Sequence, residues 1–173
     1  MADLLHVLRY ERTAIAAGEW WRLLSGHLVH LDAGHALLNA AALGFLCLLF
    51  RREYAPRQWL AIVVGSVVAI DSGLWLLDPQ VEWYAGASGV LHGIAAAGAI
   101  AHVRQRRRSG WILAAALIVK LAYEQLRGAL PLTHGMPVVV DAHLYGVVGG
   151  AATALLLQLA SASMTRDGAR GIE

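Results

Sequence analysis

The stretch GASGVLHG, residues 86–93, places a serine, Ser88, between glycines at the start of an apolar segment. A second stretch, DAHLYG at residues 141–146, places a histidine, His143, in a similar position and is followed by two more glycines. Each segment has the length and apolar composition of a membrane helix. Because small residues let membrane helices approach closely, a serine and a histidine placed in this way predict a hydrolase that works inside the bilayer.

The composition predicts a single membrane domain. The chain has 173 residues, of which 58% are hydrophobic and 15% are charged, and its mean hydropathy is +0.54. Soluble domains carry about 25% charged residues. The formal charge of +2 is small, and we expect no nucleic-acid partner. The single cysteine, Cys47, excludes an internal disulfide, and we recognise no signal peptide at the start.

Five apolar segments, separated by proline and glycine breakers, approach the length of a spanning helix. They cover residues 37–50, 59–77, 84–103, 111–126 and 138–162. We therefore predict an all-α fold, a polytopic transmembrane helix bundle of about five spans. The expected membrane domain covers residues 1–165, with an outer-side segment at 1–34 and five transmembrane helices at 35–162. Residues 166–173 are expected to form a short cytoplasmic tail.

The arginines predict how the chain is oriented in the membrane. Nine of the fourteen basic residues follow the first, third and fifth segments, at alternating ends of the spans. The positive-inside rule places these ends in the cytoplasm. Arg9, Arg12 and Arg22 in the N-terminal segment oppose this count but are outnumbered. In this orientation the serine and the histidine of the two opening stretches lie at one depth, just below the outer surface.

Ser88 and His143 form the candidate catalytic pair. Serine becomes an effective nucleophile when an adjacent base takes its proton, and histidine suits that task near neutral pH. Gly-x-x-x-Gly surfaces at residues 89–93 and 146–150 would let the two helices touch, so that the pair meets. The alternative is that the glycines only pack helices and that Ser88 bonds its own backbone. The histidine at matching depth favours catalysis.

Three further polar residues fall at the same depth. His35 and Asn39 lie four residues apart on one helix face and are candidates for binding the oxyanion of an attacked carbonyl. The alternative for Asn39 is a hydrogen bond between helices. His92 lies one helical turn from Ser88. It could position His143 by stacking or hydrogen bonding, or it could be a packed core histidine.

The remaining polar residues have structural interpretations. Asp141 is predicted to cap the last helix, which leaves a Ser–His dyad as the catalytic unit. Lys120 and Glu124, four residues apart, are predicted to pair. Asp71 is a functional candidate by its position in a span, although we favour structural pairing. A group of histidines matches no zinc pattern, so we expect neither a metal nor a cofactor. These histidines are His27, His30 and His35.

Together these residues resemble the rhomboid family of intramembrane serine proteases. The family's Trp-Arg, His-x-x-x-Asn, Gly-x-Ser-Gly and Ala-His-x-x-Gly motifs match in order along the chain. The matching residues are Trp21, Arg22, His35, Asn39, Gly86, Ser88, Gly89, Ala142, His143, Gly146 and Gly150. The resemblance implies that Ser88 is the nucleophile and His143 the general base. It also implies an oxyanion site formed by His35, Asn39 and the Ser88 amide.

The sequence departs from the family pattern at two places. His92 stands where many rhomboids have tyrosine. Together with the helix that carries Lys120 and Glu124, it resembles the rhombosortase branch, which is linked to bacterial proteins with a C-terminal Gly-Gly sorting segment. The family core has six spans, and the first is largely missing here. We expect either a shortened bundle or a true start upstream of Met1.

The sequence therefore predicts a multi-pass serine endopeptidase of a bacterial inner membrane, with its active site toward the periplasmic side. The expected partners are the lipid bilayer and transmembrane or C-terminally anchored protein substrates, foremost the Gly-Gly sorting tails of exported proteins. Two alternatives stay open. One is a catalytically inactive rhomboid-like protein that binds membrane proteins. The other is a small transporter component that uses Asp71, Lys120 and Glu124 as a relay.

Overall fold

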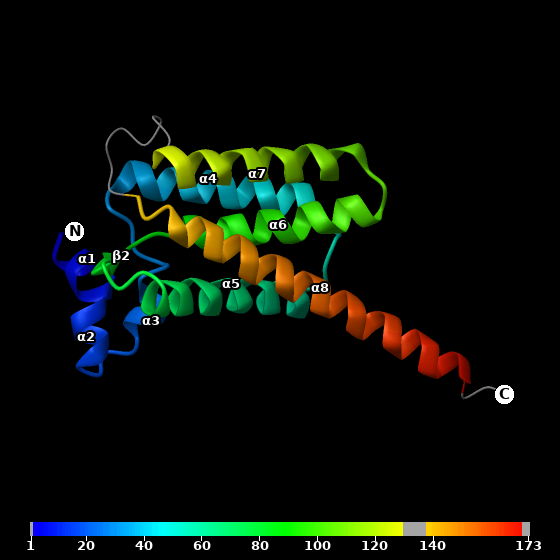
Figure 1. Ribbon diagram of the computed structural model, residues 1–173, viewed down its shortest axis with the longest axis horizontal. Helices are drawn as coiled ribbons and strands as arrows, with labels where there is room; N and C mark the ends of the chain where they lie inside the picture. The colour runs from blue at the N-terminus through cyan, green and yellow to red at the C-terminus, as the bar shows by residue number, and fades with distance from the viewer. Residues whose placement is uncertain (1, 130–137, 171–173) are drawn as a thin grey trace.

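The computed structural model describes residues 2–129 and 138–170, which form five long helices and a small N-terminal cap (Figure 1). The long helices are α4 (Ala33–Phe50), α5 (Pro56–Leu76), α6 (Ser88–Arg104), α7 (Arg108–Arg127) and α8 (Asp141–Arg170). The cap contains the short helices α1 (Ala2–Leu8), α2 (Arg12–Ala16) and α3 (Arg22–Ser25). Strands β1 (Tyr10–Glu11) and β2 (Trp83–Tyr84) pair antiparallel and join the cap to the bundle.

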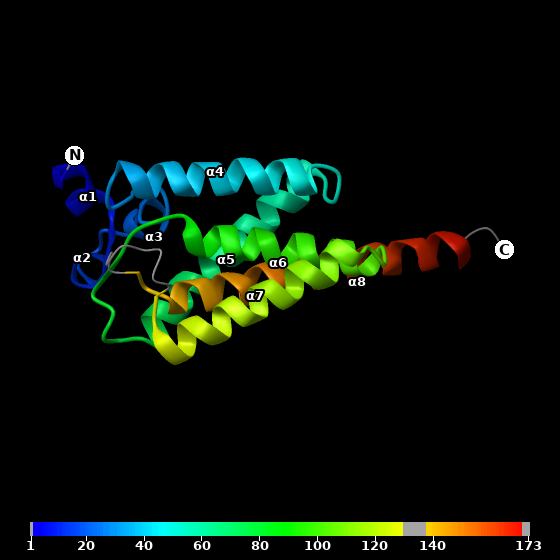
Figure 2. The same ribbon diagram turned by 90° about the horizontal axis from the view of Figure 1, so that it is seen from above.

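Helix α6 lies at the centre of the bundle. It contacts α4, α5, α7 and α8, and Figure 2 shows it between α4 and α7. Most of its alanines and glycines are buried, and Ala97 is fully covered. Small side chains let four helices approach the same helix at once. The residues at its first turn are therefore surrounded by protein on several sides.

Among the residues that the structure describes, three helices are long and apolar enough to cross a membrane, namely α4, α5 and residues 141–161 of α8. Helix α6 is shorter, with 17 residues, and it is sheltered by its neighbours. Helix α7 is continuous, but its apolar sequence is interrupted by the charged residues Lys120 and Glu124. The five helices follow the order of the five predicted segments, which confirms the prediction of an all-α polytopic bundle. The short pair β1–β2 is an addition that the sequence did not predict.

Two predicted spans begin too early. Tyr84, predicted to open the third span, lies in β2, and α6 begins only at Ser88. The chain turns between them at Gly86, whose φ of +126° is a conformation that side-chain-bearing residues rarely adopt. The last helix likewise begins later than predicted, at Asp141, and continues to Arg170 through much of the predicted tail. The glycine turn therefore ends the loop directly before the candidate nucleophile.

Two of the N-terminal arginines that do not fit the predicted orientation form hydrogen bonds within the fold. The Arg12 guanidinium donates to carbonyl oxygens at the end of α5, where a cation satisfies unpaired groups and complements the helix dipole. These carbonyls belong to Leu74, Trp75 and Asp78. Arg22 is buried and donates to the carbonyls of His6 and Arg9, and it pairs with Glu19 at 2.6 Å. These charges are fixed by the cap rather than left free in a loop.

Helices α6 and α8 meet at the two predicted Gly-x-x-x-Gly surfaces. A Cβ atom at Gly146 would collide with the carbonyl oxygen of Gly89, and a Cβ atom at Gly150 would collide with that of Gly93. The two backbones are therefore in direct contact, which only glycine permits at these positions. This contact brings His143, one turn before Gly146, next to the first turn of α6.

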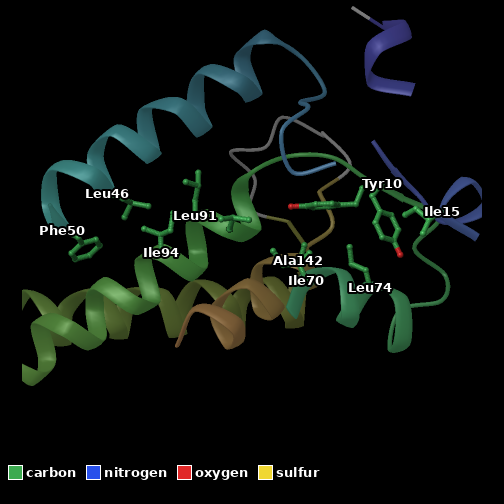
Figure 3. Packing of buried hydrophobic residues seen from close by; sticks show 11 residues of the cluster. Tyr10, Ile15, Leu46, Phe50, Ile70, Leu74, Leu91, Ile94 and Ala142 are labelled. Atoms are coloured by element: carbon green, nitrogen blue, oxygen red, sulfur yellow. The ribbon is translucent and has the colours of Figure 1, made fainter. Parts of the chain in front are cut away.

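Buried apolar side chains join the cap to the bundle (Figure 3). Tyr10 of β1, which is 1% exposed, belongs to the same cluster as Ile70 and Leu74 of α5 and Ala142 of α8. Tyr84 of β2 is part of this cluster as well. The cluster holds both ends of the loop connection that leads to α6. The packing of the cap therefore supports the position of the residues before Ser88.

Candidate active site

Ser88 and His143 are in hydrogen-bonding contact. The Ser88 Oγ atom lies 2.9 Å from His143 Nε2. Ser88 is the first residue of α6 and His143 is the third of α8, so both stand in the first turns of helices that touch through glycines. His143 is 5% exposed, and Ser88 is half-buried. The geometry is that of a nucleophile and its general base.

The other ring nitrogen of His143 contacts a carboxylate. His143 Nδ1 lies 3.0 Å from Glu124 Oε2 on α7, and the Glu124 side chain is 2% exposed. Glu124 Oε2 also accepts from Lys120 Nζ at 2.6 Å, which confirms the predicted pairing of these two residues. The contact between Glu124 and His143 was missed from the sequence. Its one signal was a carboxylate inside an apolar segment, which is costly to bury without a partner or a function.

His92 packs on His143, the candidate general base. The His92 and His143 rings stack with their centroids 4.2 Å apart and an angle of 21° between their planes. His92 Nδ1 donates to the Ser88 carbonyl oxygen at 2.6 Å, so the ring is held on its own helix one turn below Ser88. The stacking that the sequence offered as one of two possibilities for His92 is present in the structure.

His35 reaches the loop before Ser88. A Cβ atom on Gly86 would lie 2.9 Å from His35 Cε1, so glycine at this position lets the ring approach the backbone. The His35 ring also packs edge-on against His30, at 5.1 Å between centroids. Burial lowers the pKa of His30, which favours its neutral form. His35 is thus placed beside the loop that leads to Ser88, the candidate nucleophile.

Asn39 has a different environment from the one predicted for an oxyanion ligand. Its side chain is 7% exposed, and its Nδ2 atom donates to the carbonyl of His35 in its own helix at 3.1 Å. In the described part of the chain, the hydrogen bond of the Asn39 amide is this local one and not one to Ser88 or His143. Asn39 lies one turn further from the loop than His35, so its role stays a prediction.

The Trp-Arg motif lies in the cap. Trp21 is 53% exposed and Trp20 is 71% exposed, as expected for an anchor at the membrane surface. Arg22 instead points inward and bonds the cap together.

Asp141 lies inside the first turn of α8, where its carboxylate accepts from Gln125 at 3.0 Å. The prediction that Asp141 is the N-cap residue of the last helix is therefore wrong. Asp141 is already helical, and its carboxylate bonds Gln125 of the neighbouring helix α7.

The loop before Ser88 is fixed by hydrogen bonds from both sides. The Tyr84 hydroxyl donates to the carbonyl oxygen of Gly86, and the Gly86 amide donates to Gly26 of the cap at 2.9 Å. Burial raises the pKa of the Tyr84 hydroxyl, so it remains a donor. The first helical bond of α6 runs from the Leu91 amide to the Ala87 carbonyl, which leaves the Ser88 amide at the open end of the helix.

One cluster in the described residues has the side chains of a metal site. His92, Glu124 and His143 offer ligand atoms that lie within 4.8 Å of one another. However, the Lys120 ammonium lies 2.6 Å from Glu124 Oε2 and 3.4 Å from His143 Nδ1. A cation already neutralises this carboxylate, and a divalent ion would have to displace it. The cluster therefore fits a hydrogen-bonded proton-transfer site better than a metal site.

Comparisons with known proteins agree with the geometry. The rhomboid domain family matches residues 17–159. "Putative rhomboid protease YdcA" of Bacillus subtilis (strain 168) is 26% identical over 136 residues, which are 79% of this chain and 66% of that protein. "Rhomboid protease GluP" of the same organism is 31% identical over 83 residues, which are 48% of this chain and 16% of that protein.

The matches differ in how much of each relative they cover. The chain spans about two thirds of the length of the first relative and about a sixth of the second. No solved structure matches the chain. The family match covers most of the chain, including the cap, the loop before Ser88 and the first turns of α6 and α8. The chain therefore belongs to the rhomboid family.

Proposed function

We propose that the chain is an intramembrane serine endopeptidase in which Ser88 is the nucleophile and His143 the general base. The observation that carries the proposal is the 2.9 Å hydrogen bond between Ser88 Oγ and His143 Nε2, formed between helices whose backbones touch. The names of the two relatives, which both contain the words rhomboid protease, support it.

The proposed reaction is acyl transfer to serine followed by hydrolysis. Ser88 Oγ attacks the carbonyl carbon of a peptide bond while its proton passes to His143 Nε2. The Ser88 amide, at the positive end of α6, and the His35 ring are the proposed donors to the oxyanion. His143 then gives its proton to the leaving amine, and the C–N bond breaks. Water, deprotonated by His143, releases the acid and restores the Ser88 hydroxyl.

The proposed location is a bacterial inner membrane, with the site toward the periplasmic side. The two connections richest in arginine, α4–α5 and α6–α7, lie at the end of the bundle opposite to the cap (Figure 1). The first turns of α6 and α8, which carry the catalytic pair, lie at the cap end. By the positive-inside rule the arginine-rich end faces the cytoplasm, and the site faces outward.

The proposed substrates are membrane-anchored proteins with a Gly-Gly sorting tail. His92, one of the residues through which the chain resembles the rhombosortase branch, stacks on His143, and this contact supports the proposal. A substrate segment with glycines has no side chains to exclude it from a narrow site, and it unwinds from a helix at little cost. These two points favour a Gly-Gly tail over an ordinary apolar span.

The alternative functions fit the structure less well. An inactive relative has no need for a serine and a histidine in bonding contact, and both are present. The relay of a transporter would link Asp71 with Lys120 and Glu124. Instead, Asp71 pairs with His27 at 3.2 Å, whereas Lys120 and Glu124 belong to the His143 cluster. The three charged residues of the supposed relay thus belong to two separate groups.

The proposal is tested with the full chain reconstituted in liposomes together with a substrate that carries a Gly-Gly tail, an apolar helix and basic residues. We expect one cut near the glycines, mapped by mass spectrometry. The matched control is the same substrate with Leu-Leu in place of Gly-Gly, which we expect to be cut at least about tenfold more slowly. Equal cutting of both would reject the Gly-Gly preference. If the chain cut neither of these substrates, nor an ordinary transmembrane substrate, the result would favour an inactive relative.

A further inference from the structure

We infer that Glu124 positions His143 for catalysis, so that the working unit is a Ser88–His143–Glu124 triad rather than a dyad. The inference rests on the proposed function and deepens it. Glu124 Oε2 lies 3.0 Å from His143 Nδ1, while Ser88 Oγ lies 2.9 Å from Nε2 on the opposite side of the ring. The carboxylate, the imidazole and the hydroxyl thus form one continuous chain of hydrogen bonds from α7 through α8 to α6.

The carboxylate selects the tautomer that a general base requires. A carboxylate accepts hydrogen bonds, so the 3.0 Å contact with Glu124 favours the ring proton on Nδ1. The Lys120 ammonium, which only donates, lies farther from the same nitrogen, at 3.4 Å. Nε2 then has a free lone pair that can accept the Ser88 proton. The opposite tautomer, with the proton on Nε2, would be unable to act as the base. Which nitrogen holds the proton is set by the hydrogen bond that the other nitrogen makes.

Glu124 also sets the charge that His143 faces when it becomes an imidazolium. Without Glu124, the nearest charge to Nδ1 would be the Lys120 ammonium, 3.4 Å away, which opposes a second positive charge. The other titratable groups that face His143 are the stacked His92 ring and the more distant His35. Among these groups in the described chain, the Glu124 carboxylate is the one that favours the charged form.

Burial argues for a function rather than a chance contact. The Glu124 side chain is 2% exposed within an apolar helix, where a carboxylate is costly unless it is paired. Lys120 on the same helix supplies the pairing charge, and it is more exposed, at 27%. The pair together is close to neutral, which lets a carboxylate reside at the depth of His143. Lys120 is therefore assigned to holding Glu124, and Glu124 to holding His143.

The experiment compares the wild-type chain with Glu124→Gln and the matched control Glu82→Gln, both reconstituted in full length. The maximal kcat and the KM are measured across the pH range in which the protein stays folded. Glutamine keeps the size of the side chain, but its amide can donate to Nδ1 and so stabilise the wrong tautomer. We expect Glu124→Gln to lower the maximal kcat on the order of 10³-fold with KM changed less than about threefold.

The control separates positioning from the loss of one carboxylate charge. Glu82→Gln makes the same change at an exposed loop residue before β2, so its maximal kcat should stay within about twofold of wild type. A thermal unfolding midpoint near that of wild type shows that neither variant has merely lost its fold. Equal losses in both variants, or a maximal kcat in Glu124→Gln within tenfold of wild type, would overturn the positioning role. An inactive wild-type chain would overturn the proposed function itself.

Discussion

Replacing Ser88 by alanine is expected to reduce proteolysis to the level of liposomes without enzyme. Loss of the nucleophile or its base in a serine protease costs on the order of 10⁶ in kcat. Here the loss leaves His143 with no hydroxyl at Nε2, because Ser88 Oγ lies 2.9 Å from that nitrogen. The Ser88→Ala change removes one oxygen at a half-buried position, so the helices should still pack.

The measurement is the rate of product formation from a membrane-anchored substrate at saturating concentration. Ser72→Ala is the matched control, because Ser72 lies exposed on α5 and a serine is again replaced by alanine. We expect the control to retain wild-type turnover. Membrane insertion and the unfolding midpoint should be the same in both variants. Cleavage by Ser88→Ala at more than a few per cent of the wild-type rate would require a different nucleophile.

Replacing Gly146 by alanine is expected to destabilise the bundle and to inactivate the enzyme. A Cβ atom at this position would collide with the backbone carbonyl of Gly89, which cannot rotate away as a flexible side chain can. Overpacking of a tight contact costs about 1–3 kcal/mol, and a backbone neighbour favours the upper end of that range. Separation of α6 from α8 also moves His143 from Ser88, and a misplacement of 1 Å can cost about 10²-fold in rate.

The comparison is with Gly44→Ala, the same substitution at another helical glycine. A Cβ atom at Gly44 on α4 would have no neighbour within 4 Å, so this variant should fold and cleave like wild type. Thermal unfolding in detergent and turnover in liposomes are measured for both variants. If Gly146→Ala matched Gly44→Ala in both measurements, the close backbone contact between α6 and α8 would not be needed for the site.

The fold and the contact between Ser88 and His143 could be predicted from the sequence because each rests on a local pattern. Hydropathy located the five helices, and the glycines at i and i+4 on two of them located the surface where they meet. Once α6 and α8 touch at Gly89 and Gly146, their first turns must lie together. The meeting of Ser88 and His143 follows from that register.

Other features depend on contacts between distant parts of the chain. The strand pair and the turn at Gly86 that follows it depend on the pairing of β2 with β1 in the cap. A two-residue strand is too short to give a periodic pattern in the sequence. Arg12 and Arg22 counted against the orientation because their use as partners for backbone carbonyls appears only in the tertiary structure. A charge count treats every arginine as free in a loop.

The role of Glu124 shows the same limit most clearly. From the sequence, the spacing to Lys120 explained this carboxylate as half of an ion pair, and the structure contains that pair. The four-residue spacing does not reveal that the carboxylate on α7 faces the first turn of α8. The helices α7 and α8 are connected by a segment whose sequence gives no register between them. The third residue of the proposed triad was therefore hidden behind a correct local prediction.

The most direct test of the account is to map the adduct of a fluorophosphonate probe on the purified full-length chain by peptide mass spectrometry. We predict one modified residue, Ser88, and a loss of modification in His143→Ala, since the hydroxyl reacts only when its proton can pass to Nε2. Ser72→Ala should be modified as the wild type is. An unmodified wild-type chain, or modification of Ser88 that persists at full rate in His143→Ala, would contradict the account.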